Sequence, residues 1–307
     1  MIKPDKFISA NRHKLFRIII LKPGGVNKKV KKGINIWSFK SGMTVAECMA
    51  MARDAGYDGI ELSLDEEGEI SLDSSEKEIL EIKKIAEDQG IEIASLATGL
   101  YWAYPVTSSD PGIRQKSKDI VRKQLEIAAC LGTDGILVVP GAVAGLDPGS
   151  EVVQYDVAYN RALEAFAELK AEAESFKVSI GLENVWNKFL LSPLEMRDFI
   201  DRIDSPYVGA YLDVGNIIYT GYPEHWIRIL GKRIKKVHFK DYRRGVGTLE
   251  GFVDLLAGDV NFPEVIRALN DIGYDDYVTA EMIPNYTYHT NQIIYNTSRS
   301  MDTILGR

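Results

Sequence analysis

From residue 33 onward, short apolar runs with β-strand character alternate with longer runs whose apolar positions follow the helical repeat. Glycine or a cluster of turn residues marks each change of period. We count eight such pairs, with strand candidates at 33–39, 59–64, 91–99, 135–141, 179–185, 208–215, 234–241 and 276–282. Apolar strands that alternate with helices indicate a parallel sheet covered by helices.

The helical segments carry their own start and stop signals. Helical periodicity covers 44–56, 76–90, 119–132, 159–176, 194–203 and 263–273. Ser192 and Pro193 supply an N-cap and a first-turn proline ahead of LEMRDFIDRI. Glycines stand where a left-handed C-cap is expected at the ends of four helices: Gly56, Gly90, Gly132 and Gly273. These signals support the helix boundaries.

Eight strand–helix repeats predict a closed (β/α)8 TIM barrel, an α/β fold whose typical size is about 250 residues. We expect one barrel domain over residues 33–307. The main rival is a doubly wound open sheet, but no G-x-G-x-x-G or P-loop pattern follows the first strand. The glycine-rich stretch GVGTLEG (245–251) is interpreted as a flexible loop before it is considered a phosphate cradle.

Charge separates the first residues from the rest of the chain. Residues 1–32 hold ten Lys or Arg and one Asp, whereas the remainder holds 27 basic and 43 acidic residues. We expect 1–32 to be an N-terminal extension, with two interpretations open. It is an artefact of start-site choice, since Gly24-Gly25 and Val30 can be encoded by a ribosome-binding-site-like GGAGGT and a GTG start codon, or it is a disordered or barrel-capping extension.

The overall composition excludes some classes of binding partner and indicates the cellular compartment. A formal net charge of −7 argues against a protein that works by neutralising nucleic-acid phosphates or by adhering to anionic lipid. The apolar run FRIIIL (16–21) is too short for a signal peptide or a membrane span. The two cysteines, Cys48 and Cys130, are far apart and fit reduced thiols. We therefore expect a cytoplasmic protein that acts on a small molecule, without nucleic-acid or membrane partners.

Four consecutive strands each end in a residue that can bind a metal. Glu183 ends the fifth strand and Asp213 the sixth, His238 lies at the end of the seventh, and Glu281 ends the eighth. In a TIM barrel these ends converge on the active-site rim. Three carboxylates gathered there would repel one another unless a cation lies between them. Three carboxylates and one imidazole suit one divalent ion, Mn²⁺ before Mg²⁺, Co²⁺ or Zn²⁺.

Other polar and aromatic residues of the strands are candidates for different roles. Trp37, Trp102 and Trp186 follow strands one, three and five, where their rings either stack on the C–H face of a sugar or simply pack. Glu61, inside GIELSL, is interpreted as an inward-pointing structural residue and not as a metal ligand.

The segments GLENVWNKFLLSP, YLDVGN, KKVHFKDYRR and VTAEM resemble motifs of the sugar phosphate isomerase/epimerase family with a xylose isomerase-like TIM barrel, which includes D-tagatose 3-epimerase. The likeness runs from about residue 33 to the end. It implies that Arg244 contacts the substrate, with Arg243 as a neighbouring alternative. Asn216 stands where tagatose-epimerase-like members carry a histidine, so we expect Asn216 to contact the substrate and to alter specificity.

The resemblance implies a metal-dependent isomerase that acts on a sugar or sugar phosphate. It leaves open whether the protein forms a homo-oligomer. Glu183 and Glu281 would be the catalytic pair: one takes a proton from C3 of a ketose and the other returns a proton to the opposite face. Aldose–ketose isomerisation by the same pair and dehydration of an inosose stay as alternatives. A non-enzymatic sugar-binding barrel with vestigial ligands is the rival from another class. A DNA-repair endonuclease on the same barrel is disfavoured by the acidic chain and its four histidines.

Overall fold

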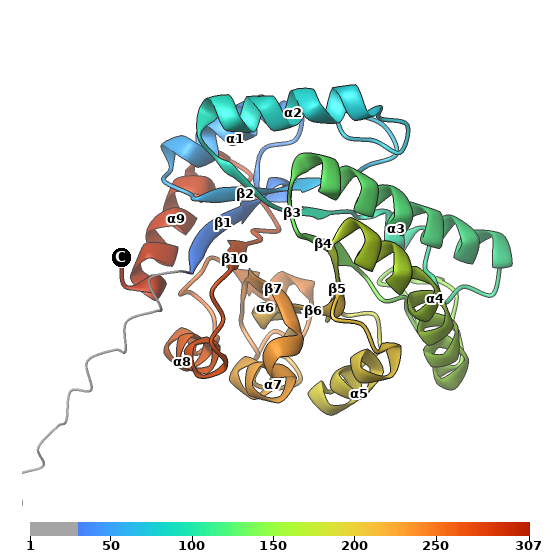
Figure 1. The fold of residues 1–307 in the computed structure, drawn as a ribbon. Helices are drawn as coiled ribbons and strands as arrows, with labels where there is room; N and C mark the ends of the chain where they lie inside the picture. The colour runs from blue at the N-terminus through green and yellow to red at the C-terminus, as the bar shows by residue number, and fades with distance from the viewer. Residues whose placement is uncertain (1–29) are drawn as a thin grey trace, which may run out of the picture.

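The computed structural model describes residues 30–307, so the predicted extension lies almost wholly outside the described residues. Eight parallel strands form a closed barrel in the order β1-β10-β7-β6-β5-β4-β3-β2, and helices surround it (Figure 1). The predicted (β/α)8 barrel is therefore confirmed. Its strands are β1 (Lys31–Asn35), β2 (Gly59–Ser63), β3 (Glu92–Ala97), β4 (Gly135–Val138), β5 (Ser179–Glu183), β6 (Val208–Asp213), β7 (Ile234–Phe239) and β10 (Tyr277–Ala280).

The helices follow the strands, as the periodicity predicts. They are α1 (Val45–Asp54), α2 (Glu76–Gln89), α3 (Pro111–Leu131), α4 (Tyr155–Phe176), α5 (Pro193–Ile203), α6 (Val214–Ile217), α7 (Pro223–Leu230), α8 (Phe262–Ile272) and α9 (Gln292–Leu305). Short 3-10 turns cover Ile36–Ser38, Leu100–Trp102, Gly231–Arg233 and Leu249–Gly251. Among residues 30–307, none of these helices is both long and apolar enough to cross a bilayer.

The local signals act as expected. The Ser192 side chain accepts a hydrogen bond from the Glu195 amide at the start of α5, and Pro193 occupies its first turn. The glycines predicted to end helices all have positive φ, from +66° at Gly90 to +84° at Gly132. Each helix thus stops at the turn that feeds the next strand.

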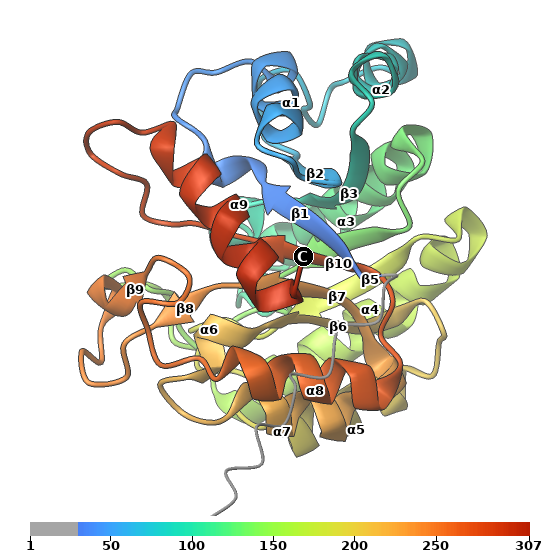
Figure 2. The same cartoon turned by 90° about the vertical axis from the view of Figure 1, so that its left-hand side faces the viewer.

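The predicted helical ranges do not include α6, α7 and α9, and a hairpin between β7 and α8 was not predicted either. After β7 the chain forms a small antiparallel hairpin from β8 (Asp241–Tyr242) and β9 (Phe252–Val253), and GVGTLEG is part of its connection. Figure 2 shows this hairpin at one end of the barrel, near α6. The Asp241 carboxylate fixes the segment after β9 by accepting hydrogen bonds from the Leu256, Gly258 and Val260 amides. The Asp241 carboxylate therefore holds residues 256–260, whereas most of GVGTLEG is exposed and its flexibility stays a prediction.

Register places the predicted ligands in one layer. Asp213 on β6 is the register partner of His238 on β7, and the Glu281 amide donates to the Phe239 carbonyl just beyond the end of β10. Residues paired in a parallel sheet point to the same face. Because the strands are buried on both faces, the layer of polar side chains inside the barrel has little access to water.

Candidate metal centre

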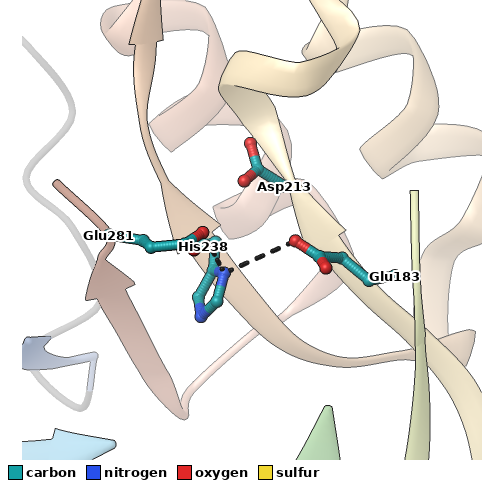
Figure 3. A group of neighbouring side chains, drawn as sticks. All are labelled: Glu183, Asp213, His238 and Glu281. Carbon is teal, nitrogen blue, oxygen red and sulfur yellow. Dashed lines mark ion pairs between the residues drawn. The ribbon is translucent and has the colours of Figure 1, made fainter. Parts of the chain in front are cut away.

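Glu183, Asp213, His238 and Glu281 converge at the carboxyl ends of the strands. Each offers one ligand atom, and these four atoms all lie within 4.8 Å of one another. Figure 3 shows the side chains reaching toward a common point from separate strands. All four are buried, with exposed fractions from 0% for Asp213 and His238 to 6% for Glu183. The structure thus brings the predicted ligand set together.

Glu61 fixes the orientation of the His238 ring on the side away from the other ligands. Its Nε2 lies 2.7 Å from Oε1 of Glu61. Since an ionised carboxylate only accepts hydrogen bonds, Nε2 carries the hydrogen, and in the neutral imidazole Nδ1 keeps its lone pair. Nδ1 faces the other ligands, at 3.1 Å from Glu281 and 3.7 Å from Glu183. A histidine held in this way is the usual arrangement of a metal ligand.

Glu61 is the centre of a buried polar network across the barrel. Its Oε1 also accepts from Asn35 Nδ2 at 2.5 Å, and its Oε2 accepts from Ser95 Oγ and Tyr211 OH, each at 2.5 Å. Burial alone would raise the pKa of Glu61, but His238 and these donors outweigh it and lower the pKa below its usual value. The inward placement predicted for Glu61 is confirmed. Its contact with His238 orients the imidazole ring.

Three buried polar atoms of the cluster have no hydrogen-bond partner of normal geometry within the described residues: Asp213 Oδ2, His238 Nδ1 and Glu281 Oε2. Buried polar atoms are almost always satisfied. The Lys240 ammonium lies near Asp213 Oδ2 and Glu281 Oε2, but three carboxylates beside one ammonium leave negative charge that a cation would balance. All three are electron-pair donors that face one another. The donor set of three carboxylates and an imidazole fits one divalent cation of the Mn²⁺ or Mg²⁺ type.

Lys240 is a residue of the candidate site that the sequence reasoning missed. Its Nζ lies 2.6 Å from Glu281 Oε2 and 3.3 Å from Asp213 Oδ2, and its side chain is only 13% exposed. Lys240 follows His238 by two residues, and side chains two residues apart along a strand point to the same face. This alternation could have identified Lys240 from the sequence.

The two glutamates have separated proton affinities. Burial raises the pKa of Glu183 to about 7, with the Glu281 charge adding to the effect. Burial would raise the pKa of Glu281 as well, but Lys240 and His238 outweigh it and lower the pKa to about 2. Burial opposes protonation of His238, yet Glu61 and the other carboxylates raise its pKa well above the usual value. The same concentration of negative charge favours a divalent cation.

A pocket of about 530 Å³ opens from this centre, and we call it the mouth pocket. It is lined by Trp37, Thr98, Gly99, Trp102, Leu137, Val139, Leu146, Glu183, Val185, Trp186, Asn216, Lys240, Leu249, Glu250, Phe252, Glu281, Ile283 and Pro284. All three predicted tryptophans and Asn216 are in this set. Asn216 lies beside Asp213, because its backbone N–H donates a hydrogen bond to Asp213 Oδ1 at 2.9 Å.

Arg244 lies elsewhere. Its Nε donates to the Ile218 carbonyl at 2.9 Å, and its guanidinium covers the Tyr222 ring at 4.9 Å. Arg243 donates to the Ala257 carbonyl. Neither arginine lines the mouth pocket, so their contact with substrate stays a prediction.

The chain matches the family model described as xylose isomerase-like TIM barrel over residues 49–301. A putative L-ribulose-5-phosphate 3-epimerase from Haemophilus influenzae is 26% identical to it, with 83% of this chain and 89% of that relative covered. L-Ribulose-5-phosphate 3-epimerase from Escherichia coli is 25% identical, with 81% and 86% covered.

Solved structures share the fold. D-psicose 3-epimerase from Clostridium cellulolyticum H10, determined with D-tagatose, superposes with a TM-score of 0.74 at 18% identity and covers 90% of this chain and 99% of its own. An L-ribulose 3-epimerase gives a TM-score of 0.73 at 20% identity, with 90% and 95% covered. At these identities the likeness shows the common barrel.

Proposed function

The chain belongs to the xylose isomerase-like TIM barrel family and is an enzyme of the isomerase class, and we propose that it is a divalent-metal-dependent ketose 3-epimerase. The observation that carries this proposal is the cluster of four ligand atoms within 4.8 Å at the base of a substrate-sized pocket. The relatives named as 3-epimerases, at about a quarter identity over most of their length, support the reaction type.

We propose that Glu183, Asp213, His238 and Glu281 hold one divalent ion, Mn²⁺ by preference. Such an ion, when bound, stabilises the negative charge of an enediolate, which makes the proton on the carbon beside a carbonyl removable. Glu61 holds the His238 ring so that Nδ1 faces the site. Asp213 and His238 act only as metal ligands, whereas Glu183 and Glu281 also line the pocket.

Glu183 and Glu281 project from β5 and from the end of β10 into the mouth pocket, so a substrate between them meets a carboxylate on each side. One takes the C3 proton and the other returns a proton to the opposite face, which inverts the centre. Lys240, ion-paired with Glu281, places a positive charge beside the reacting oxygens.

The apolar walls of the pocket exclude water from the reacting carbon. Trp37 and Trp186 line the pocket together with the two glutamates, and Trp186 is fixed by a hydrogen bond from its Nε1 to the Asn216 carbonyl at 2.9 Å. A proton taken from the substrate and kept away from water returns to the substrate more readily than it exchanges with solvent. Aldose–ketose isomerisation and inosose dehydration use the same proton abstraction, so the product distinguishes them from epimerisation.

The test is deuterium incorporation at C3 of a panel of ketoses in D2O, measured by mass spectrometry with the Mn²⁺-loaded full chain. Glu183→Gln and Glu281→Gln each preserve shape and remove the proton-transfer group, so we expect at least about a 100-fold loss of exchange. Glu164→Gln, on the exposed face of α4, is the matched control and keeps the wild-type rate. Wild-type exchange in either active-site variant contradicts the two-glutamate scheme.

A further inference from the structure

The part of the mouth pocket beyond the metal centre is built from apolar side chains. It consists of Trp37, Trp102, Leu137, Val139, Leu146, Val185, Trp186, Leu249, Phe252, Ile283 and Pro284. Four of these residues, Trp102, Leu146, Leu249 and Ile283, are between 41% and 48% exposed. Large apolar side chains left open to water around one pocket mark a binding surface.

This apolar wall is held in place. Trp186 packs against Tyr242 and Phe252, with ring centroids 5.3 Å and 5.6 Å apart. The Tyr242 hydroxyl donates to the Thr248 carbonyl at 2.8 Å, which anchors the segment that carries Leu249. The wall is therefore formed before a ligand arrives.

The charges of the pocket do not suit a phosphate. Among its lining residues the one cation is Lys240, and its ammonium is paired with Glu281 and Asp213 at the reacting end. Glu250, which follows Leu249 in the chain and also lines the pocket, adds a negative charge. A phosphate dianion there would need cationic or N–H donors to replace its hydration.

Two arginines near the pocket are directed elsewhere, whereas Lys40 and Lys188 line hollows that adjoin it. Arg243 and Arg244 donate to the carbonyls of Ala257 and Ile218. Lys188 is exposed and lines an adjoining hollow of about 300 Å³, which Trp186 and Val185 share with the mouth pocket. A phosphate that used Lys188 would therefore leave the apolar wall unfilled.

We propose that the substrate is a ketose whose end away from the metal centre carries an uncharged apolar substituent, of aryl or alkyl type, in place of a phosphate. This inference rests on the proposed function, because it takes the reacting carbons to lie at the metal centre. The volume of about 530 Å³ is in the range used by drug-sized ligands and leaves room beyond a monosaccharide. The sugar occupies the polar end, and the substituent stacks among the tryptophans and Phe252.

The test compares three probes on the Mn²⁺-loaded full chain: a ketopentose, its 5-phosphate and its 5-O-benzyl ether. Dissociation constants come from tryptophan fluorescence, since three tryptophans line the pocket. Burial of a phenyl ring predicts that the benzyl ether binds about 10- to 100-fold more tightly than the free sugar. The 5-phosphate is expected to bind no better than the free sugar. A phosphate that binds as tightly as the benzyl ether, or more tightly, overturns the proposal.

A matched pair of variants locates the substituent. Leu249→Lys places a cation on the wall and is expected to reduce the preference for benzyl ether over phosphate at least tenfold. Val246→Lys makes a similar change at a 44% exposed site of the same loop that does not line the pocket, and it should leave the preference as in wild type. An unchanged preference in Leu249→Lys contradicts the proposed wall contact.

The same probes separate this inference from the proposed function. Tight benzyl-ether binding without deuterium exchange at C3 of any probe supports the substrate class and refutes the epimerase. Exchange that is fastest with the 5-phosphate supports the epimerase and refutes the substrate class. Absence of binding by all three probes overturns the inference as well.

Discussion

Glu61→Gln tests whether the buried network behind His238 sets the affinity of the metal centre. Glutamine preserves the shape, and its amide oxygen can take the place of Oε1, which accepts from Asn35 and His238. Its amide nitrogen then faces the hydroxyls of Ser95 and Tyr211, which can rotate to accept. The contacts to Asn35 and His238 are therefore kept without the charge, and the Ser95 and Tyr211 hydroxyls lose Oε2 as an acceptor, although one of them can donate to the other across 3.0 Å.

The magnitude follows from that lost charge. A hydrogen bond to a charged group contributes about 1.5–3 kcal/mol and a neutral one about 0.5–1.5 kcal/mol, so the His238 contact weakens by about 1 kcal/mol or more. Loss of the carboxylate also makes Nδ1 a poorer electron donor. Replacing such an outer partner typically costs about 10- to 100-fold in metal affinity, or about 1.4–2.7 kcal/mol.

The assay is competition for Mn²⁺ against a fluorescent chelator at fixed pH, with the melting temperature measured alongside. Ser95→Ala is the control, because it removes one donor from Oε2 and leaves the Glu61–His238 contact in place. We expect a tenfold or larger rise in Kd for Glu61→Gln and a smaller one for Ser95→Ala. A folded Glu61→Gln variant whose Kd stays within about twofold of wild type would refute the reasoning.

Two further predictions concern pH and packing. Metal affinity should rise from pH 5 to pH 8, because the pKa of Glu183 is raised to about 7 and that of His238 lies well above its usual value, and both protons must leave before a cation binds; a flat Kd over this range in the chelator assay would contradict it. Gly209→Ala should destabilise the barrel by about 1–3 kcal/mol, because the added methyl would lie 2.2 Å from the Arg233 carbonyl oxygen. Thermal unfolding should show a lower Tm for Gly209→Ala and an unchanged Tm for Gly245→Ala, which has open space; equal Tm values would contradict the packing argument.

The barrel and the convergence of the candidate ligands could be predicted because their signals are local. Each strand is a short apolar run with its own turn residues, and the barrel topology brings the last polar residue of each run to one rim. Asp213 and His238 are found in this way, one strand apart and in register. No long-range information is needed beyond the order of the elements.

The parts that sequence reasoning missed depend on distant contacts. Glu61 meets Tyr211 and His238 across 150 and 177 residues of chain, so its role cannot be read from its own strand. The short β8–β9 pairing is likewise fixed by Asp241 and amides 15 to 19 residues later. Lys240 looked like one residue of a charged strand end until its ammonium was placed between Glu281 and Asp213.

The central claim is that Glu183, Asp213, His238 and Glu281 form one divalent-metal site, and elemental analysis after loading with Mn²⁺ and desalting tests it most directly. We predict one ion per chain in the wild type and a clear loss of bound metal in Asp213→Asn and His238→Ala, since each removes a ligand that the cluster uses. One full ion per chain retained in both variants, with the fold intact, would contradict the account.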